Sequence, residues 1–264
     1  MSTTPADDGQ VRLEIADRIA VVTLDRPEFR NALTLAMYDR LAEIARAIVP
    51  GGEIAALIVT GGGDRAFAAG TDISAFRDFS TAEQALGYEA HMDEVLGAIE
   101  RCPVPTIAAI AGACTGGGAA IAACCDLRIA TSDMRFGFPI ARTLGNCLSI
   151  ANLARLSALI GFGRTKEILF TARLIEAEEA RAIGLVSTLF DDHAALMAGA
   201  RELAALVAGH APLTLRATKE AMRRMRADPA AADGDLVTLC YTSADFAEGR
   251  EAFLAKRRPQ WKGH

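Results

Sequence analysis

Residues 107–118 read Ile107-Ala-Ala-Ile-Ala-Gly-Ala-Cys-Thr-Gly-Gly-Gly118, and an alanine-rich run follows directly, from Ala119 to Cys124. The apolar run predicts a buried strand that ends at the glycines, and the alanines predict a helix. Glycines at a strand-to-helix junction expose main-chain N–H groups, and a helix N-terminus adds positive partial charge. Such a corner suits an oxygen that gains negative charge during a reaction. It lacks the lysine and Ser/Thr of a P-loop, so it does not predict a nucleoside triphosphate site.

The bulk composition is that of a protein with a sizeable apolar core. The chain has 264 residues, of which 51% are hydrophobic, and its formal net charge is −5. This acidic balance argues against a dedicated nucleic-acid binder. Six cysteines without CxxC spacing predict reduced thiols and a cytoplasmic location. Residues 1–10 contain no apolar signal core, and no apolar run is long and unbroken enough to predict a membrane span.

Predicted strands and helices alternate over the first part of the chain. Strands are expected at 11–15 and 19–24, joined by a hairpin at Asp17-Arg18, and at 54–60 and 127–130. Helices are expected after Thr34 and Thr81, because each of these side chains can cap a helix N-terminus. The alternation predicts an α/β fold with parallel strand pairing.

From about residue 191 the pattern predicts helices only. The expected ranges are 194–209, 213–226, 231–248 and 249–257. We therefore expect an α/β core over residues 1–195 and a helical C-terminal region over residues 196–264.

Five segments together resemble the crotonase superfamily, also called the enoyl-CoA hydratase/isomerase family. In the family's order, they are Leu24-Asp-Arg-Pro-Glu-Phe-Arg-Asn-Ala-Leu33, Ala66-Phe-Ala-Ala-Gly-Thr-Asp-Ile73, the stretch from Pro105 to Ala130, Glu178-Glu-Ala-Arg-Ala-Ile-Gly-Leu-Val186 and Phe253-Leu-Ala-Lys-Arg-Arg-Pro259. The resemblance implies a crotonase-like spiral of ββα units with a C-terminal helical trimerisation region. It also implies a homotrimer or homohexamer, an acyl-CoA thioester substrate, no further cofactor and no metal.

The same resemblance places two oxyanion amides, at Thr71 and Gly117. Removing a proton from the α-carbon of a thioester, or attacking its β-carbon, puts negative charge on the carbonyl oxygen. Two preorganised N–H donors stabilise that enolate, by roughly 3 kcal/mol each in comparable sites.

The chain departs from the family where hydratases carry two catalytic glutamates. One of these positions lies three residues after the middle glycine of the triplet and is Ala120 here. The other follows the proline of Phe136-Gly-Phe-Pro139 and is Ile140. Neither residue can transfer a proton, so the usual hydration mechanism is not supported, and the isomerase variant that uses the second position is also in doubt.

The segment Ile140-Ala-Arg-Thr-Leu-Gly-Asn-Cys-Leu-Ser149 is polar where the family usually has a glycine-rich loop. Asn146, Cys147 and Arg142 are therefore candidates to face the acyl group. The segment loosely resembles the 4-chlorobenzoyl-CoA dehalogenase branch, in which a histidine lies on the preceding helix, and His91 is the corresponding candidate. The nucleophilic aspartate of that branch has no counterpart here, which argues against dehalogenation. The alternatives are a buried inert thiol for Cys147, a packing role for His91 and a surface salt bridge for Arg142.

Further residues are candidates for contact with the substrate or its CoA moiety. By the resemblance, these candidates include Ala68, Ala69, Gly70, Asp72, Ile73, Gly116, Ala120, Pro139 and Ile140. Arg26 and Arg30 can reach phosphates as charged donors, or can be solvated surface charges. Asp72 is expected first as a structural cap. Lys256 belongs to a basic cluster that either approaches the CoA nucleotide or complements a helix dipole, and Phe253 would pack on the adenine.

We expect an acyl-CoA thioester-binding enzyme that stabilises a thioester enolate, acts as a lyase or isomerase of fatty-acid metabolism and hydrates crotonyl-CoA poorly. Two alternatives remain open. One is a non-catalytic acyl-CoA binder, and the other is a different thioester chemistry that uses Cys147 or His91.

Overall fold

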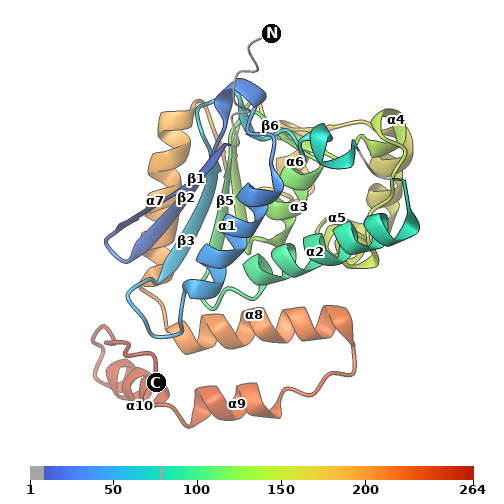
Figure 1. Ribbon diagram of the computed structural model, residues 1–264. Helices are drawn as coiled ribbons and strands as arrows, with labels where there is room; N and C mark the ends of the chain where they lie inside the picture. Colours follow the sequence, from blue (N-terminus) through green and yellow to red (C-terminus); the bar gives the residue numbers. More distant parts are fainter. Residues whose placement is uncertain (1–8, 78–79) are drawn as a thin grey trace.

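The computed structural model describes residues 9–77 and 80–264. The predicted absence of a signal segment over residues 1–10 falls mostly outside this part of the chain. Within the described residues, no helix is both long enough and apolar enough to cross a membrane. Figure 1 shows a twisted sheet with helices on both faces and a group of C-terminal helices beneath it.

A six-stranded sheet forms the centre of the fold. Its strands, in spatial order, are β1 (Gln10–Ala16), β2 (Ile19–Asp25), β3 (Ala56–Gly61), β5 (Thr106–Ile110), β7 (Leu127–Thr131) and β10 (Leu189–Phe190). β1 and β2 pair antiparallel, and the remaining neighbours pair parallel. The predicted hairpin is confirmed, since Asp17 and Arg18 have φ values of 50° and 64°, as a tight two-residue turn requires. The predicted α/β class is confirmed as well.

A second sheet corrects the prediction of one strand up to the glycine triplet. It contains β4 (Ala66–Ala68), β6 (Ala113–Thr115), β8 (Arg135–Gly137) and β9 (Ile175–Glu176). The chain passes from β5 in the first sheet to β6 in the second by bending at Gly112, whose φ is 57°. A Cβ on Gly112 would lie 2.2 Å from the Arg65 carbonyl oxygen, so only glycine allows this bend.

Helices on the two faces of the main sheet enclose two apolar clusters. One face carries α1 (Leu35–Ala47), α2 (Ala82–Glu100) and α3 (Gly117–Cys124), which pack with the large buried side chains of the core. Thr34 and Thr81 cap α1 and α2 as predicted. The other face carries α7 (His193–Ala208), whose Leu196, Ala200 and Ala204 are fully buried against the sheet. The core also contains the 3-10 turns η1 (Pro27–Phe29) and η2 (Ile73–Phe76), the short helices α4 (Ile140–Thr143) and α6 (Ala177–Ala182), and the long helix α5 (Ile150–Thr171).

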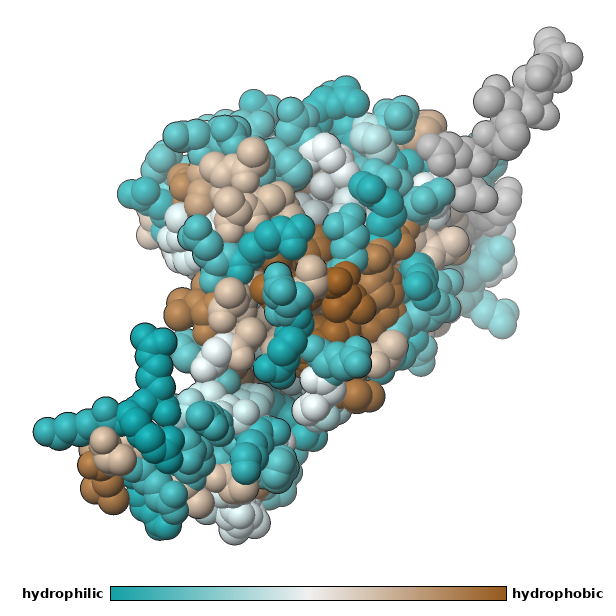
Figure 2. Space-filling model, turned by 90° about the vertical axis from the view of Figure 1, so that its left-hand side faces the viewer, coloured by the Kyte–Doolittle hydropathy of each residue, from teal (hydrophilic) through white to brown (hydrophobic). Residues whose placement is uncertain are grey.

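The C-terminal region contains α8 (Pro212–Ala227), α9 (Gly234–Tyr241) and α10 (Ala244–Leu254). Two helices are present where helices were predicted at 231–248 and 249–257, but the predicted bounds are wrong, because the chain turns at Thr242 and Ser243, where the Ser243 hydroxyl caps α10. In Figure 2 a smaller lobe stands out at one corner of the molecule, below a face on which apolar residues gather. The expected division after residue 195 would cut α7 just after its start. Because α7 packs on the sheet, we propose that the division lies between α7 and α8.

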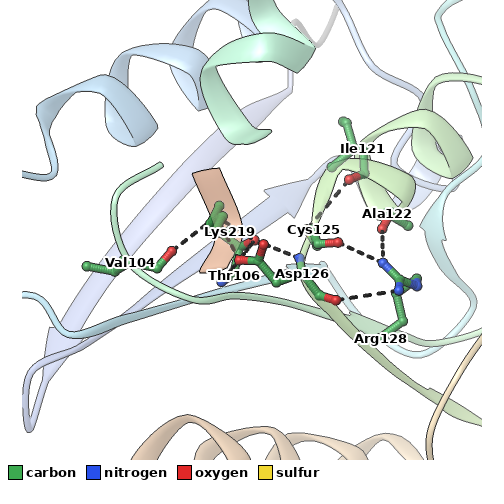
Figure 3. Close-up of polar contacts among 8 residues, drawn as sticks. All are labelled: Val104, Thr106, Ile121, Ala122, Cys125, Asp126, Arg128 and Lys219. Carbon is green, nitrogen blue, oxygen red and sulfur yellow. Dashed lines mark hydrogen bonds and ion pairs between the residues drawn. The ribbon is translucent and has the colours of Figure 1, made fainter. Parts of the chain in front are cut away.

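Polar contacts of Lys219 connect α8 with the core (Figure 3). Its Nζ lies 2.7 Å from Asp126 Oδ2 and donates to the Val104 carbonyl oxygen at 3.2 Å. Asp126 also accepts hydrogen bonds from the backbone N–H and the hydroxyl of Thr106, at 2.7 and 2.8 Å. Asp126 therefore has a structural role, as an acceptor for both the main chain and α8. Nearby, the Arg128 guanidinium is buried and donates to the carbonyl oxygens of Leu185 and Cys125.

Replacing Lys219 with methionine is expected to lower the free energy of unfolding by about 1–3 kcal/mol, because the variant leaves Asp126 and the Val104 carbonyl without a donor from α8. Urea unfolding at neutral pH measures the change. Lys166→Met changes an exposed lysine of α5 and serves as the matched control. Equal stability losses in the two variants would contradict the anchoring role of Lys219.

Candidate active site

A pocket opens where α2, α3 and the segment after β8 meet the loop that follows β4. Its lining includes residues 69–71 of that loop and residues 115–117 at the start of α3. Side chains of α2 and most of the residues between 138 and 148 close the remaining sides. Most of the lining is apolar, so a polar group that lies in the pocket is partly shielded from water.

Thr71 and Gly117 lie side by side in this pocket. The Thr71 hydroxyl oxygen would be 3.1 Å from a Cβ built on Gly117. One residue earlier in each segment, the Gly70 Cα would be 3.5 Å from a Cβ built on Gly116. The backbones at residues 70–71 and 116–117 are therefore in close contact, and larger side chains at the glycine positions would prevent this contact.

Hydrogen bonds hold the residues on each side of the two candidate amides. The Leu33 N–H donates to the Gly70 carbonyl oxygen at 2.8 Å, and the Leu33 carbonyl oxygen accepts from the Asp72 N–H at 2.8 Å. The Gly116 N–H donates to the Gly137 carbonyl oxygen at 2.9 Å. Within the described residues, no protein acceptor is bonded to the N–H of Thr71 or of Gly117. Both donors are thus held in place and available to a ligand, and the donor of Gly117 lies in the first turn of α3.

Two tyrosine hydroxyls flank Thr71. Tyr38, from α1, lies 2.9 Å from the Thr71 hydroxyl, and Tyr88, from α2, lies 3.2 Å from it. Burial raises the pKa of both phenols, so both stay protonated at neutral pH. This hydroxyl chain connects α1, the Thr71 loop and α2, and it lies next to Gly117, because a Cβ there would sit 1.8 Å from the Tyr38 hydroxyl oxygen.

Arg26 supports the Thr71 loop, which corrects its predicted contact with a CoA phosphate. The side chain is buried beside the Phe29 ring, and its Nη1 lies 2.5 Å from Asp72 Oδ2. Asp72 also accepts a hydrogen bond from the Ser74 N–H at 2.9 Å, so its predicted role as a cap is confirmed. The hydrogen bond from Arg26, followed by that from Ser74, lowers the pKa of Asp72 to about 2. A buried, paired guanidinium is not available to a phosphate.

The Asp72 carboxylate is expected to stabilise the fold at neutral pH and to lose this effect in acid. Its folded pKa of about 2 lies below the ordinary 3.8, so its contribution is complete above pH 4 and declines as the pH falls toward 2. Asp72→Asn should cost about 1 kcal/mol at pH 6, after allowance for solvent screening, and clearly less at pH 3. Urea unfolding of the variant and the parent at both values measures this. A cost that does not change with pH would contradict the ion pair.

The structure brings only some of the other predicted residues into the pocket. The predicted residues that line it are Ala69, Gly70, Gly116, Ala120, Pro139, Ile140, Asn146 and Cys147. Ala68 is buried behind the pocket, where its carbonyl oxygen would be 2.3 Å from a Cβ on Gly118. Ile73 and Arg142 are not among the lining residues. Arg30 is exposed, and its carbonyl oxygen accepts from the Ala69 N–H at 3.0 Å, so it lies beside the pocket loop.

His91 lies outside the pocket, contrary to the prediction. Its Nε2 is 2.9 Å from Asp39 Oδ1 on α1, and both side chains are partly exposed. Phe253 lies in the last turn of α10 and is 84% exposed, and Lys256 follows two residues after the end of the helix. Figure 1 places α10 at the opposite end of the molecule from α4, and contact of these two residues with the nucleotide stays a prediction.

Tyr38 and Glu89 are among the pocket residues that were not identified as such from the sequence. Tyr38 follows Met37 on the buried face of α1, and only the tertiary structure brings its hydroxyl to Thr71. Glu89 precedes the pocket-lining residues Met92 and Leu96 by three and seven positions. This helical spacing is the signal that could have identified it as a pocket residue.

The family model for enoyl-CoA hydratase/isomerase matches residues 14–264. The chain belongs to this family. The family's crotonase-like α/β fold, with its C-terminal helical region, is therefore the fold of this protein.

Named relatives extend over nearly the whole chain. It is similar to a short-chain-enoyl-CoA hydratase of Clostridium acetobutylicum, with 35% identity over 252 residues, which is 94% of this chain and 95% of the relative. A crotonyl-CoA hydratase of Syntrophomonas wolfei is 36% identical over 253 residues, covering 93% of this chain and 95% of the relative. An enoyl-CoA hydratase/carnithine racemase from Magnetospirillum magneticum has a similar crystal structure, with a TM-score of 0.87, 35% identity and 98% coverage of both chains.

Proposed function

We propose that the protein binds acyl-CoA thioesters and stabilises the thioester enolate with the N–H groups of Thr71 and Gly117. The observation that carries this proposal is that Thr71 and Gly117 are neighbours in a largely apolar pocket and that, within the described residues, neither N–H group has a protein acceptor. In such surroundings a hydrogen bond to a developing oxyanion is stronger than it is in water. The names of the relatives, which are hydratases of enoyl-CoA substrates, support the choice of ligand.

We further propose that hydration is not the efficient reaction of this site. Ala120 and Ile140 line the pocket at the positions where the family resemblance expects the hydratase glutamates. Adding water to an enoyl thioester requires one group to activate the water and one to protonate the α-carbon, and neither side chain can do this. The proposal therefore separates this chain from the activity that its relatives' names describe.

Several wider properties belong to the same proposal. The CoA thioester is the substrate, and no separate cofactor is invoked. A homotrimer or homohexamer is supported by large apolar side chains that are exposed on the C-terminal helices, such as Met222, Met225 and Phe253. A cytoplasmic location is supported by six cysteines that are all free thiols.

Incubating the protein in D₂O with butanoyl-CoA, but-3-enoyl-CoA and crotonyl-CoA tests the proposed function. We expect the thioesters to raise the melting temperature more than free CoA does. We also expect mass spectrometry to detect deuterium at the α-carbon of at least one thioester, with slow formation of the hydrated product from crotonyl-CoA. Binding without exchange or product would favour a non-catalytic acyl-CoA binder. Absence of binding would contradict the whole proposal.

A further inference from the structure

α2 brings a carboxylate into the pocket that contains the two candidate amides. Glu89 is half-buried and lines the pocket together with Met92 and Leu96, which lie three and seven residues further along the same helical face. Thr71 and Gly117 line the same pocket. Of the lining residues that the structure describes, Glu89 alone carries a carboxylate.

The surroundings of Glu89 are those of a proton-transfer group and not those of a structural ion pair. Within the described residues, no hydrogen bond or ion pair holds its carboxylate. The neighbouring Asp93, one turn further on, accepts a hydrogen bond from the Ser149 hydroxyl at 2.9 Å and lies 3.9 Å from Arg155. Burial, with a smaller contribution from Asp93, raises the pKa of Glu89. A carboxyl group with a raised pKa is a better acid and base near neutral pH than an ordinary one.

The remaining titratable groups in the lining are poorer candidates. Tyr38 and Tyr88 are held protonated by burial and share the hydroxyl chain through Thr71. Cys147 is exposed at the rim of the pocket, and the sole histidine of α2 is bonded to Asp39 outside it. Of the described lining residues, Glu89 is therefore the best candidate for proton transfer.

We propose that Glu89 is the catalytic proton carrier of this site and that it moves a proton between the α- and γ-carbons of an enoyl thioester. Starting from a β,γ-enoyl thioester, the Glu89 carboxylate takes a proton from the α-carbon. The electron pair of that C–H bond enters a dienolate whose oxygen accepts hydrogen bonds from Thr71 and Gly117. Glu89 then returns the proton to the γ-carbon, which leaves the double bond between the α- and β-carbons. No water is consumed, so one carboxylate suffices where hydration requires two groups. The proposal rests on the proposed function of the two amides.

The test compares Glu89→Gln, Glu89→Asp and Glu94→Gln with the parent. Glu94 is an exposed residue of the same helix and provides the matched control. But-3-enoyl-CoA in D₂O supplies two readouts, which are isomerisation followed by absorbance and α-deuteration followed by mass spectrometry. We expect Glu89→Gln to keep its thioester affinity and to lose about 10²- to 10⁴-fold in both rates. Glu89→Asp should retain part of the rates, and Glu94→Gln should match the parent.

The outcomes separate this inference from the proposed function. A parent protein that exchanges α-protons, with undiminished rates in Glu89→Gln, overturns the role of Glu89 and leaves the enolate site standing. A parent protein that binds thioesters but neither exchanges nor isomerises them overturns both the role of Glu89 and enolate formation. Equal losses in Glu89→Gln and Glu94→Gln would also overturn the assignment, because the effect would then not be specific to the pocket.

Discussion

Replacing Gly117 with alanine is expected to reduce α-proton exchange by about 10²- to 10³-fold, which is the effect of losing one oxyanion donor. The new Cβ would lie 1.8 Å from the Tyr38 hydroxyl oxygen, and Tyr38 is fully buried and bonded to Thr71. The clash must therefore displace the start of α3 or the Tyr38–Thr71 pair, and either shift moves a candidate donor. Overpacking of this kind also costs stability, by about 1–3 kcal/mol. Exchange rates by mass spectrometry and urea unfolding measure the two effects.

A second substitution shows whether the clash is the cause. Gly117 does not have a positive φ, so its backbone conformation is open to alanine. In the double variant Tyr38→Phe/Gly117→Ala the clashing oxygen is gone, and the nearest remaining atoms would be 3.1 Å from the Cβ. We expect the double variant to recover stability and much of the exchange rate relative to Gly117→Ala. Gly163→Ala, at an open position on α5, is the control for adding a methyl group. Full activity in Gly117→Ala would contradict the proposed geometry.

Introducing two glutamates, in Ala120→Glu/Ile140→Glu, is expected to increase crotonyl-CoA hydration by about 10²-fold or more. Both positions line the pocket that holds Thr71 and Gly117, so both new carboxyl groups can reach a bound thioester. One group would activate water and the other would protonate the α-carbon. Product formation is measured by chromatography of the 3-hydroxyacyl thioester.

The control for this gain of activity is Leu144→Glu, which adds a carboxylate to the exposed rim of the same pocket. It should leave hydration unchanged, because only carboxylates at the two family positions are expected to flank the reacting carbons. A folded double variant with no more hydration than the parent would show that the loss of the two glutamates is not what limits this reaction.

Local signals in the sequence predict much of this fold. The hairpin at Asp17-Arg18 and the caps at Thr34 and Thr81 involve residues close together in the chain, so short patterns suffice. The bend at Gly112 could not be predicted in this way, because it depends on the Arg65 carbonyl from another segment. The break at Ser243 was missed because helix-forming residues precede it in Gly234–Tyr241 and follow it in Ala244–Leu254, with no glycine or proline between them.

Local sequence patterns also fail to predict the contacts within the candidate site. The placement of Thr71 beside Gly117 followed from family resemblance, and no local pattern relates two segments that are 46 residues apart in the chain. Arg26 was expected either to reach a phosphate or to be a solvated surface charge, but its side chain is buried and bonded to Asp72, which is also 46 residues away in sequence. The contact of Tyr38 with Thr71 depends on how α1 packs beside the loop after β4. Such contacts are products of tertiary packing, and a single sequence carries no local signal for them.

The infrared carbonyl stretch of bound [1-¹³C]butanoyl-CoA tests most directly whether two main-chain donors polarise one thioester oxygen. Hydrogen bonds from Thr71 and Gly117 would lengthen the C=O bond, so we expect the isotope-edited band to move to lower wavenumber on binding. The shift should be smaller in Gly117→Ala and unchanged in Gly163→Ala. A bound carbonyl with the same frequency as the free thioester in water would contradict the oxyanion site.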